Sequence, residues 1–183
     1  MTLQKAKNRR SILTADFYKL KKSIIYDILT YNLFGGGGMQ LVAKHFDQLT
    51  TTQVYEILKV RTKIFTFEQR IDYLDMDDID YNSRHFFFEE DKKVTAYLRA
   101  YHKNNDESVI YVGRVLSNPH GIGLGTELIK QTIKWIKTNT SCNKICLDSQ
   151  IGAVSFYEKL GFKTVSNEFL EAGIPHIQME LEI

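Results

Sequence analysis

The clearest chemical signal in this chain is a glycine-rich turn between an expected strand and an expected helix. The segment His-Gly-Ile-Gly-Leu-Gly at 120–125 follows a β-branched run at 108–117 and precedes a helical pattern. Glycines at a helix start let the backbone approach a ligand closely, and the exposed N–H groups with the helix dipole favour anions. We therefore expect a diphosphate site here, with a plain tight turn as the alternative interpretation.

Two familiar phosphate loops do not fit this segment. A Walker loop ends in Gly-Lys followed by Ser or Thr, whereas Gly125 is followed by Thr126 and Glu127. A Rossmann fingerprint requires a parallel βαβ unit. The strand expected before this turn is instead the last of three strands that short hairpins would join in antiparallel order, as described next.

Periodicity and turn residues define the elements that must position this turn. Three runs rich in β-branched or aromatic residues, at 84–90, 94–102 and 108–117, are separated by short polar turns and predict an antiparallel meander. Before them we expect a strand at 40–46 and a helix whose buried face carries Val54, Ile57, Leu58, Arg61 and Phe65. After the turn we expect a helix, a strand at 144–149, a short helix at 153–160 closed by Gly161, and strands at 163–169 and 176–182. The fold class is therefore α+β, with helices on both faces of one sheet.

At this point the sequence resembles a known family. A pattern of Arg or Gln, two residues, then Gly-x-Gly or Gly-x-Ala after a meander strand is the acetyl-CoA pyrophosphate loop of the GNAT acetyltransferases, and residues 120–125 are similar to it. The segment Phe-Tyr-Glu-Lys-Leu-Gly-Phe at 156–162 looks like the second signature of that superfamily, on its fourth helix. The resemblance implies the GNAT fold, a mixed and mostly antiparallel sheet, with acetyl-CoA as co-substrate and no metal.

A narrower resemblance is to the ElaA-like branch, and it covers residues 39–183 and none of 1–38. The residues that carry it are Val54, Tyr55, Arg61, Phe65, Glu68, Gln69, Tyr73, Asp75, Asp77, Asp80, His85, Ala96, Tyr97, Leu98, Arg99, Gly113, Arg114, Val115, Gln150, Phe156, Tyr157, Glu171, Gly173, Ile174, Pro175, His176 and Met179. Two positions depart from the pattern: His120 stands where the superfamily usually has Arg or Gln, and Ala172 where this branch commonly has Asp. Most contacts of such a loop come from backbone N–H groups, so we expect His120 to be tolerated with slightly weaker binding.

The resemblance assigns cofactor binding to the end of the fourth strand, the glycine turn and the residue that opens the fourth-helix segment. These residues are Arg114, Val115, Leu116, His120, Gly121, Ile122, Gly123, Leu124, Gly125, Thr126 and Gln150.

Acetyl transfer to an amine needs a neutral nucleophile and a proton for the departing thiolate. A lysine-like amine with a pKa near 10.4 is neutral about once in 2,500 molecules at pH 7, a deficit of ~4.6 kcal/mol. A general base or a water chain must therefore assist. For the acid, the resemblance points to Tyr157, whose phenol would protonate the CoA sulfur. The alternative is that Tyr157 is only an aromatic packed beside Phe156.

The general base has several candidates, all in stretches specific to the narrower branch: Glu68, Asp75, Asp77, Glu171 and His176. His176 opens the last strand, where it would face the acceptor groove unless it is a structural histidine. Glu68 follows the apolar end of a helix, where partial burial would raise its pKa.

An acidic run precedes the meander. Its members are Asp72, Asp75, Asp77, Asp78 and Asp80. The run does not fit an EF-hand, because that loop requires glycine at its sixth position. A solvated loop is one interpretation, and a lip that attracts cationic acceptors is the other. Tyr73 and Phe86–Phe88 would wall the acceptor pocket, unless the three phenylalanines serve both sheet faces as core.

Composition excludes several classes of protein. The 183 residues are 43% apolar and 25% charged, as in ordinary globular chains, and no apolar run approaches the roughly 18–20 residues of a membrane span. Cys142 and Cys146 would lie roughly 13 Å apart on one strand, too far to pair, which favours a reducing cytoplasm. A charge of +5 on residues 1–38 and −3 on 39–183 leaves the main domain without a broad basic footprint for nucleic acid.

Four glycines, Gly35–Gly38, directly before Met39 form the clearest boundary in the chain. Upstream, the apolar stripe within 14–33 would form a docking or membrane-surface helix, because Lys and Arg flank it. An organelle presequence is a second interpretation. We favour a third, in which residues 1–38 come from a misassigned start and the chain begins at Met39. Mass spectrometry of the protein from its native host decides between them.

These observations together predict an N-acetyltransferase that moves an acetyl group from acetyl-CoA to a primary amine by direct attack. The expected partner is a small-molecule or peptide amine, with no nucleic acid and no membrane, and the expected assembly is a cytoplasmic monomer or homodimer. A different class stays open: a non-catalytic acyl-CoA-binding sensor that acts through a protein partner.

Overall fold

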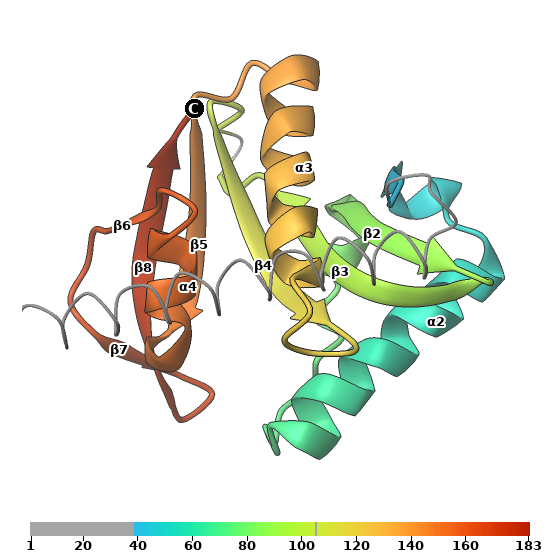
Figure 1. The fold of residues 1–183 in the computed structure, drawn as a ribbon. Helices are drawn as coiled ribbons and strands as arrows, with labels where there is room; N and C mark the ends of the chain where they lie inside the picture. Colours follow the sequence, from blue (N-terminus) through green and yellow to red (C-terminus); the bar gives the residue numbers. More distant parts are fainter. Residues whose placement is uncertain (1–38, 105) are drawn as a thin grey trace, which may run out of the picture. The chain divides into compact units, whose positions relative to one another are not determined.

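The computed structural model describes residues 39–104 and 106–183, so the expectations for residues 1–38 lie outside it. The described residues form an eight-stranded sheet in the order β1-β2-β3-β4-β5-β8-β6, with β7 paired to β8 (Figure 1). Every neighbouring pair is antiparallel except β4 and β5, which are parallel. The strands are β1 (Leu41–His45), β2 (Arg84–Glu90), β3 (Lys93–Tyr101), β4 (Val109–Ser117), β5 (Lys144–Gln150), β6 (Lys163–Thr164), β7 (Phe169–Glu171) and β8 (Ile174–Glu182).

The helices connect these strands and cover the sheet. The hydroxyl of Thr50 caps the first long helix by accepting a hydrogen bond from the Gln53 backbone N–H at 3.1 Å. The helices are η1 (Phe46–Gln48), α2 (Thr51–Arg61), the π-helix η2 (Thr62–Glu68), η3 (Ile79–Asn82), α3 (Leu124–Asn139), η4 (Ile151–Ala153) and α4 (Val154–Glu158). The predicted α+β class and the antiparallel meander are confirmed.

The predicted end of the chain was partly wrong. The single strand expected at 163–169 is two short strands, β6 and β7, and the last strand begins at Ile174 rather than at His176. Between β7 and β8, Ala172 and Gly173 both have positive φ, +49° and +76°. They form a tight hairpin turn that the sequence did not signal.

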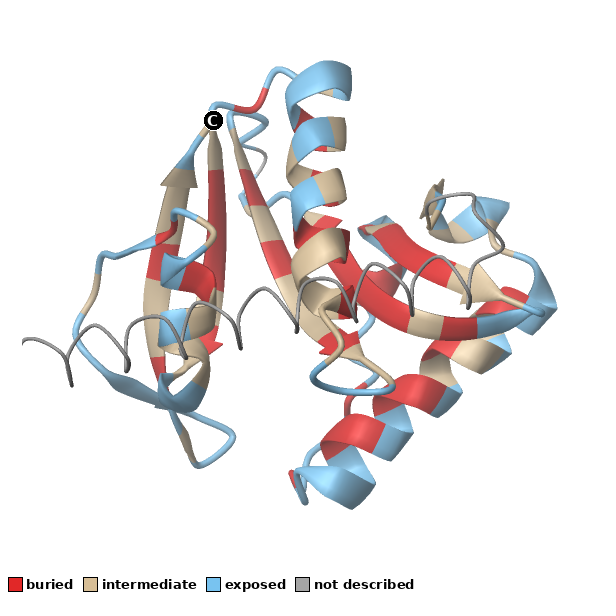
Figure 2. Ribbon diagram, viewed as in Figure 1, coloured by how far each residue is buried: buried red, intermediate tan, exposed pale blue. Residues whose placement is uncertain are grey.

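The three consecutive phenylalanines of β2 supply both sheet faces, as the strand's alternation requires. Phe86 packs edge-on against Trp135 of α3, with ring centroids 5.2 Å apart. Phe87 instead belongs to the core under α2, together with Ile57 and Tyr97. Figure 2 shows the central strands as largely buried. Helices α2 and α3 therefore cover opposite faces of the sheet.

An irregularity in β4 separates the two halves of the sheet. Tyr97 pairs with Leu116 and Arg99 pairs with Gly113, so that one residue of β3 opposes two of β4, Arg114 and Val115. Arg114 has φ +57°, as expected for a β-bulge that bends its strand. Strands β4 and β5 pair only from Val109 to Tyr111. Beyond that point β5 pairs with β8 alone, and β4 with β3 alone.

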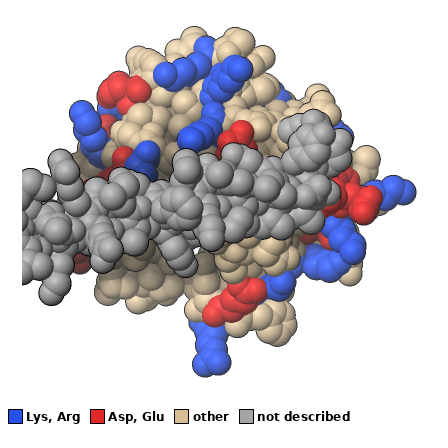
Figure 3. All heavy atoms as spheres, in the orientation of Figure 1, with Lys and Arg blue, Asp and Glu red and all other residues tan. Residues whose placement is uncertain are grey.

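The surface carries charges of both signs. Lys and Arg side chains and Asp and Glu side chains are both distributed over the visible face (Figure 3). Within the described ranges, the longest and most apolar helix still falls short of what is needed to cross a membrane.

Candidate active site

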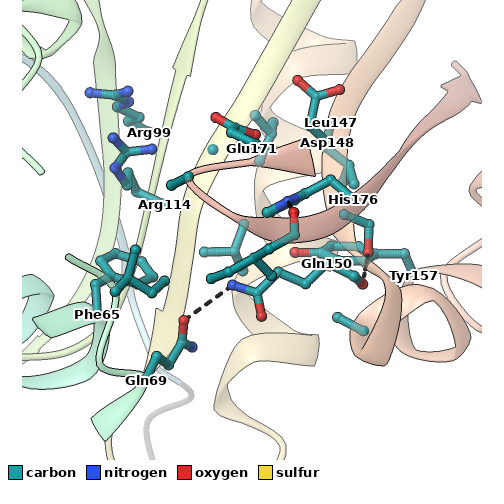
Figure 4. Close-up of a pocket in the computed structure, with 18 of the residues that line it drawn as sticks. Phe65, Gln69, Arg99, Arg114, Leu147, Asp148, Gln150, Tyr157, Glu171 and His176 are labelled. Atoms are coloured by element: carbon teal, nitrogen blue, oxygen red, sulfur yellow. Dashed lines mark hydrogen bonds between the residues drawn. The ribbon is translucent and has the colours of Figure 1, made fainter. Parts of the chain in front are cut away.

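A cavity of about 370 Å³ opens where β4 and β5 diverge. Its wall includes the bulge residues of β4 on one side and Leu147–Gln150 of β5 on the other. Side chains from β3, β4, β5 and β8 surround it (Figure 4). The cavity thus exists because the bulge ends the pairing of two parallel strands.

Strand register assigns the polar residues of the cavity to one face of the sheet. Residues paired across strands, or two apart along one strand, share a face. From Tyr97, which lies under α2, this rule leads through Tyr101 and its partner Tyr111 to Cys146. Along β5 the same face then carries Asp148, which pairs with Gln178 of β8. We call this the α2 face; it also carries Gln150 and His176, which pair with each other.

Tyr157 of α4 is the predicted acid, and it lines the cavity. Its side chain is buried, and its hydroxyl makes no hydrogen bond with the described residues. Burial raises the pKa of Tyr157 well above its ordinary value. The phenol is therefore a neutral, uncommitted donor that faces the cavity.

His176 is one of the predicted bases, and it also lines the cavity. Its Nδ1 lies 2.8 Å from the carbonyl oxygen of Ile174, which can only accept, so Nδ1 carries the proton. In the neutral ring Nε2 is then the acceptor nitrogen. The ring is buried and stacks on Phe169, with centroids 6.2 Å apart, which holds the ring plane.

The glycine turn leads into α3 and lies beside α4. Gly121 and Gly123 have φ +76° and +84°, and Gly123 is the N-cap of α3 without any side-chain cap. The first N–H groups of a helix have no intrahelical acceptor, so a diphosphate fits this backbone. A Cβ on Gly125 would lie 3.8 Å from the ring of Phe156, so α4 sits beside this turn. None of residues 120–126 lines the cavity itself.

The interpretation of the acidic run as a solvated loop was wrong for two of its members, Asp75 and Asp80. Asp75 and Asp80 are buried beside Arg61, which is fully buried. The three aspartates 75, 77 and 80 pair with three arginines in one network: Arg61 to Asp75 (2.7 Å) and Asp80 (2.7 Å), Arg99 to Asp77 (2.5 Å) and Asp80 (3.0 Å), and Arg114 to Asp75 (2.6 Å) and Asp77 (3.1 Å). We call these six residues the Arg–Asp network.

This network changes what three predicted site residues can do. Asp75 and Asp77, two candidate bases, are held as ion-pair partners. The Arg114 guanidinium, expected to serve the cofactor, is directed to the same two aspartates. Arg114 and Val115 nonetheless line the cavity, so their backbone borders the space where the two strands part.

Glu68 does not have the partial burial expected of it. It is exposed at the end of η2 and is absent from the cavity wall. Its Oε2 lies 2.7 Å from Nε2 of His120, and its Oε1 lies 3.9 Å from Nζ of Lys63. The pair joins the glycine turn to η2, because the π-helix ends directly opposite the turn.

The remaining predicted residues are divided between core and cavity. Leu116 is buried in the core under α2 and does not line the cavity. Gln150 does line it, and its Nε2 donates to Oε1 of Gln69 at 3.2 Å. Sequence reasoning missed Asp148, a cavity residue on β5. Its signal was a carboxylate within an otherwise strand-forming run.

Comparison with known proteins identifies the family to which this fold belongs. Residues 52–183 match the acetyltransferase (GNAT) domain family. The chain belongs to this family. Members of the GNAT family are acyl-CoA-dependent acyltransferases.

Individual relatives show which branch of the GNAT family this chain resembles. The GNAT domain is 33% identical over 149 residues to a UPF0039 protein of Schizosaccharomyces pombe, covering 79% of this chain and 98% of that protein. It is 29% identical over 143 residues to ElaA of Escherichia coli, covering 76% and 94%. The crystal structure of E. coli ElaA superposes with a TM-score of 0.72 at 27% identity, covering 79% of this chain and 99% of that one. An acyl-CoA N-acyltransferase from Pseudomonas aeruginosa gives 0.71 at 29%, covering 78% and 99%. The predicted ElaA-like GNAT fold is confirmed.

Proposed function

We propose that this GNAT domain is an N-acetyltransferase that transfers the acetyl group of acetyl-CoA to a primary amine by direct attack. The observation that carries the proposal is the convergence of two buried, uncommitted polar atoms on one cavity: the Tyr157 hydroxyl and Nε2 of His176.

The chain would hold its co-substrate mainly by backbone. The turn at Gly121–Gly123 and the first N–H groups of α3 would bind the diphosphate. The strand edge at Val115 would accompany the pantetheine arm into the opening between β4 and β5. Acetyl-CoA, when bound, supplies a thioester whose acyl carbon accepts the amine nitrogen.

The two side chains would then manage the protons. His176 Nε2 takes a proton from the attacking amine, and the Tyr157 hydroxyl gives a proton to the departing sulfur. A bond between nitrogen and the acyl carbon forms, the carbon–sulfur bond breaks, and the products are an N-acetylamine and free CoA thiol. The proton held by His176 returns through solvent to Tyr157, which restores both groups.

The test measures binding and turnover separately on the full chain. We expect acetyl-CoA to bind in calorimetric titration and amines to release thiol. Tyr157→Phe is expected to keep the binding and to lower kcat by about 10²- to 10⁴-fold, the usual contribution of proton transfer. Tyr55→Phe, at an exposed tyrosine of α2, is the matched control. Acetyl-CoA binding without thiol release from any amine would instead identify a sensor module.

A further inference from the structure

The charges around the cavity do not cancel. The Arg–Asp network contains three cations and three anions, so it is neutral as a unit. Two more carboxylates, Asp148 and Glu171, line the same cavity outside that network. The lysines and arginines of the described residues that line the cavity are Arg99 and Arg114, and both belong to the network. The cavity therefore has two surplus negative charges.

Neither surplus carboxylate is well compensated. Asp148 accepts a long hydrogen bond from Nε2 of Gln178 at 3.4 Å, and the cation near it, Nζ of Lys103, lies 3.8 Å away, at the outer limit of an ion pair. Lys103 is itself held over the ring of Tyr111, 4.0 Å from its centroid. The Glu171 side chain makes no hydrogen bond or ion pair with the described residues. A cation that enters the cavity would thus meet two available carboxylates.

Register brings both carboxylates to the face that carries His176. Asp148 shares the α2 face with Gln150, whose partner is His176. Across the next pairing His176 faces Phe169, and Glu171 lies two residues further on the same face of β7. Figure 4 shows the two carboxylates at one end of the cavity, with His176 beside them. The carboxylates therefore accompany the proposed reaction centre.

The chemistry of the reaction restricts which group these carboxylates can usefully hold. The attacking nitrogen must be neutral, and carboxylates that contacted it would stabilise its ammonium form instead. A non-reacting ammonium on the same molecule has no such conflict. The cavity volume lies near the lower end of the usual range for ligand pockets, about 300–1,000 Å³, which favours a small acceptor.

We propose that the acceptor is a short aliphatic diamine, whose non-reacting ammonium is bound by Asp148 and Glu171 while its other nitrogen faces His176. This inference rests on the proposed function and names its substrate class. Asp148 and Glu171 are thereby assigned to specificity rather than to proton transfer.

The test compares three acceptors by thiol release: 1,4-diaminobutane, butylamine and 4-aminobutyrate. We expect kcat/KM for the diamine to exceed that for butylamine by about 10- to 100-fold, the usual effect of hydrogen bonds to a charged group. The amino acid, whose distal group is negative, is expected to react more slowly than butylamine. Equal values for diamine and butylamine would overturn the inference.

Variants assign the preference to the two side chains. In Asp148→Asn with Glu171→Gln, the ratio of diamine to butylamine kcat/KM is expected to fall to about unity. Glu158→Gln, at an exposed residue of α4, serves as the control that keeps the ratio. A double variant with an unchanged ratio would refute the assignment. Equal losses for both amines in Glu171→Gln would make Glu171 the general base, which also overturns it.

The proposed function fails in a different way. Wild-type protein that binds acetyl-CoA and releases no thiol with any of the three amines would overturn the enzymatic proposal and this inference together. Turnover without preference for the diamine would overturn this inference alone.

Discussion

At the scale of single residues, the two proposed proton carriers owe their properties to opposite features of their surroundings. Burial raises the pKa of Tyr157, so its phenol stays protonated throughout the physiological range. His176 has one ring nitrogen committed to a carbonyl oxygen, which leaves the other as an acceptor. One group is thus set as a donor and the other as an acceptor before any substrate arrives.

The role of His176 predicts a pH-dependent defect. We expect His176→Gln to lower kcat/KM for a primary amine by about 10²-fold near pH 7. The defect should shrink as pH rises toward the amine's own pKa near 10.4, because solvent then supplies the neutral amine. The measurement is kcat/KM from about pH 6.5 to 9.5.

The control for this prediction is another histidine. His102 is exposed, hydrogen-bonded to the Val109 carbonyl and outside the cavity wall, so His102→Gln should follow the wild-type profile. A defect in His176→Gln that stays constant across the pH range would point to a structural role for that ring.

At the scale of elements, the glycine turn and the β-bulge lie close together in the chain, and we propose that both position the same co-substrate. The bulge at Arg114 parts β4 from β5 and opens the cavity. Three residues after β4 ends, the turn begins and leads into the N-terminus of α3. A diphosphate bound at that N-terminus would therefore lie one short connection away from the cavity proposed for the acyl group of the same co-substrate.

The turn predicts a specific sensitivity to a side chain. Gly123 has φ +84°, a conformation that costs an L-residue roughly 1–2 kcal/mol. We expect Gly123→Ala to change the conformation of the turn and to raise the Kd for acetyl-CoA about 10-fold, as measured by calorimetry. Gly152→Ala, where an added Cβ meets nothing within 4 Å, should leave the Kd unchanged. Unaltered binding in Gly123→Ala would show that the turn does not hold the diphosphate.

At the scale of the whole molecule, the Arg–Asp network joins the segment after η2 to the sheet. It links α2, β3 and β4 through a chain stretch that has little regular structure of its own. That stretch includes Tyr73, which lines the cavity. The network therefore stabilises the fold and holds one wall of the proposed acceptor site.

Breaking the network should be costly. Asp80 bridges Arg61 and Arg99 from a buried position, and its removal leaves two buried guanidinium groups short of a partner. We expect Asp80→Asn to lower the free energy of unfolding by about 3 kcal/mol, as measured by urea denaturation. The exposed Asp72 provides the control, because Asp72→Asn should change it by less than about 0.5 kcal/mol. Equal effects of the two substitutions would contradict a structural role for the network.

The same network predicts how stability depends on pH. Burial by itself raises the pKa of Asp80, but hydrogen bonds and charges from Arg61 and Arg99 outweigh it and lower the pKa below its ordinary value. Arg99 and Arg114 lower the pKa of Asp77 in the same way against its burial. Because these values lie below the unfolded value near 3.9, the stabilisation is complete above roughly pH 5 and is lost as pH falls through the folded values.

Urea denaturation between about pH 2 and 7 measures this dependence. We expect the wild-type free energy of unfolding to fall below about pH 4. Asp80→Asn is expected to show a shallower decline, because one of the responsible carboxylates is gone. A variant that declines as steeply as the wild type would exclude Asp80 as a source of the acid sensitivity.

Much of the fold could be predicted from the sequence, because the patterns that indicate helices and strands are local. The bounds of β2 were predicted to the residue, and α2 was expected from the face that carries Ile57 and Arg61. The two short strands near 163–171 were not predicted as separate strands, because so few paired residues leave no periodic pattern. The hairpin turn at Ala172 was missed for a related reason, since alanine rarely adopts positive φ.

By itself the sequence determined the meander, the glycine turn and the tyrosine of the short helix, because turn residues, periodicity and motif spacing are properties of neighbouring residues. Only the tertiary structure decided which charged groups were available for chemistry. In sequence, Asp75 and Asp148 are both carboxylates, but folding surrounds the first with guanidinium groups and leaves the second beside a cavity with one distant lysine. Ion pairing depends on distances between elements far apart in the chain, and no local pattern records them.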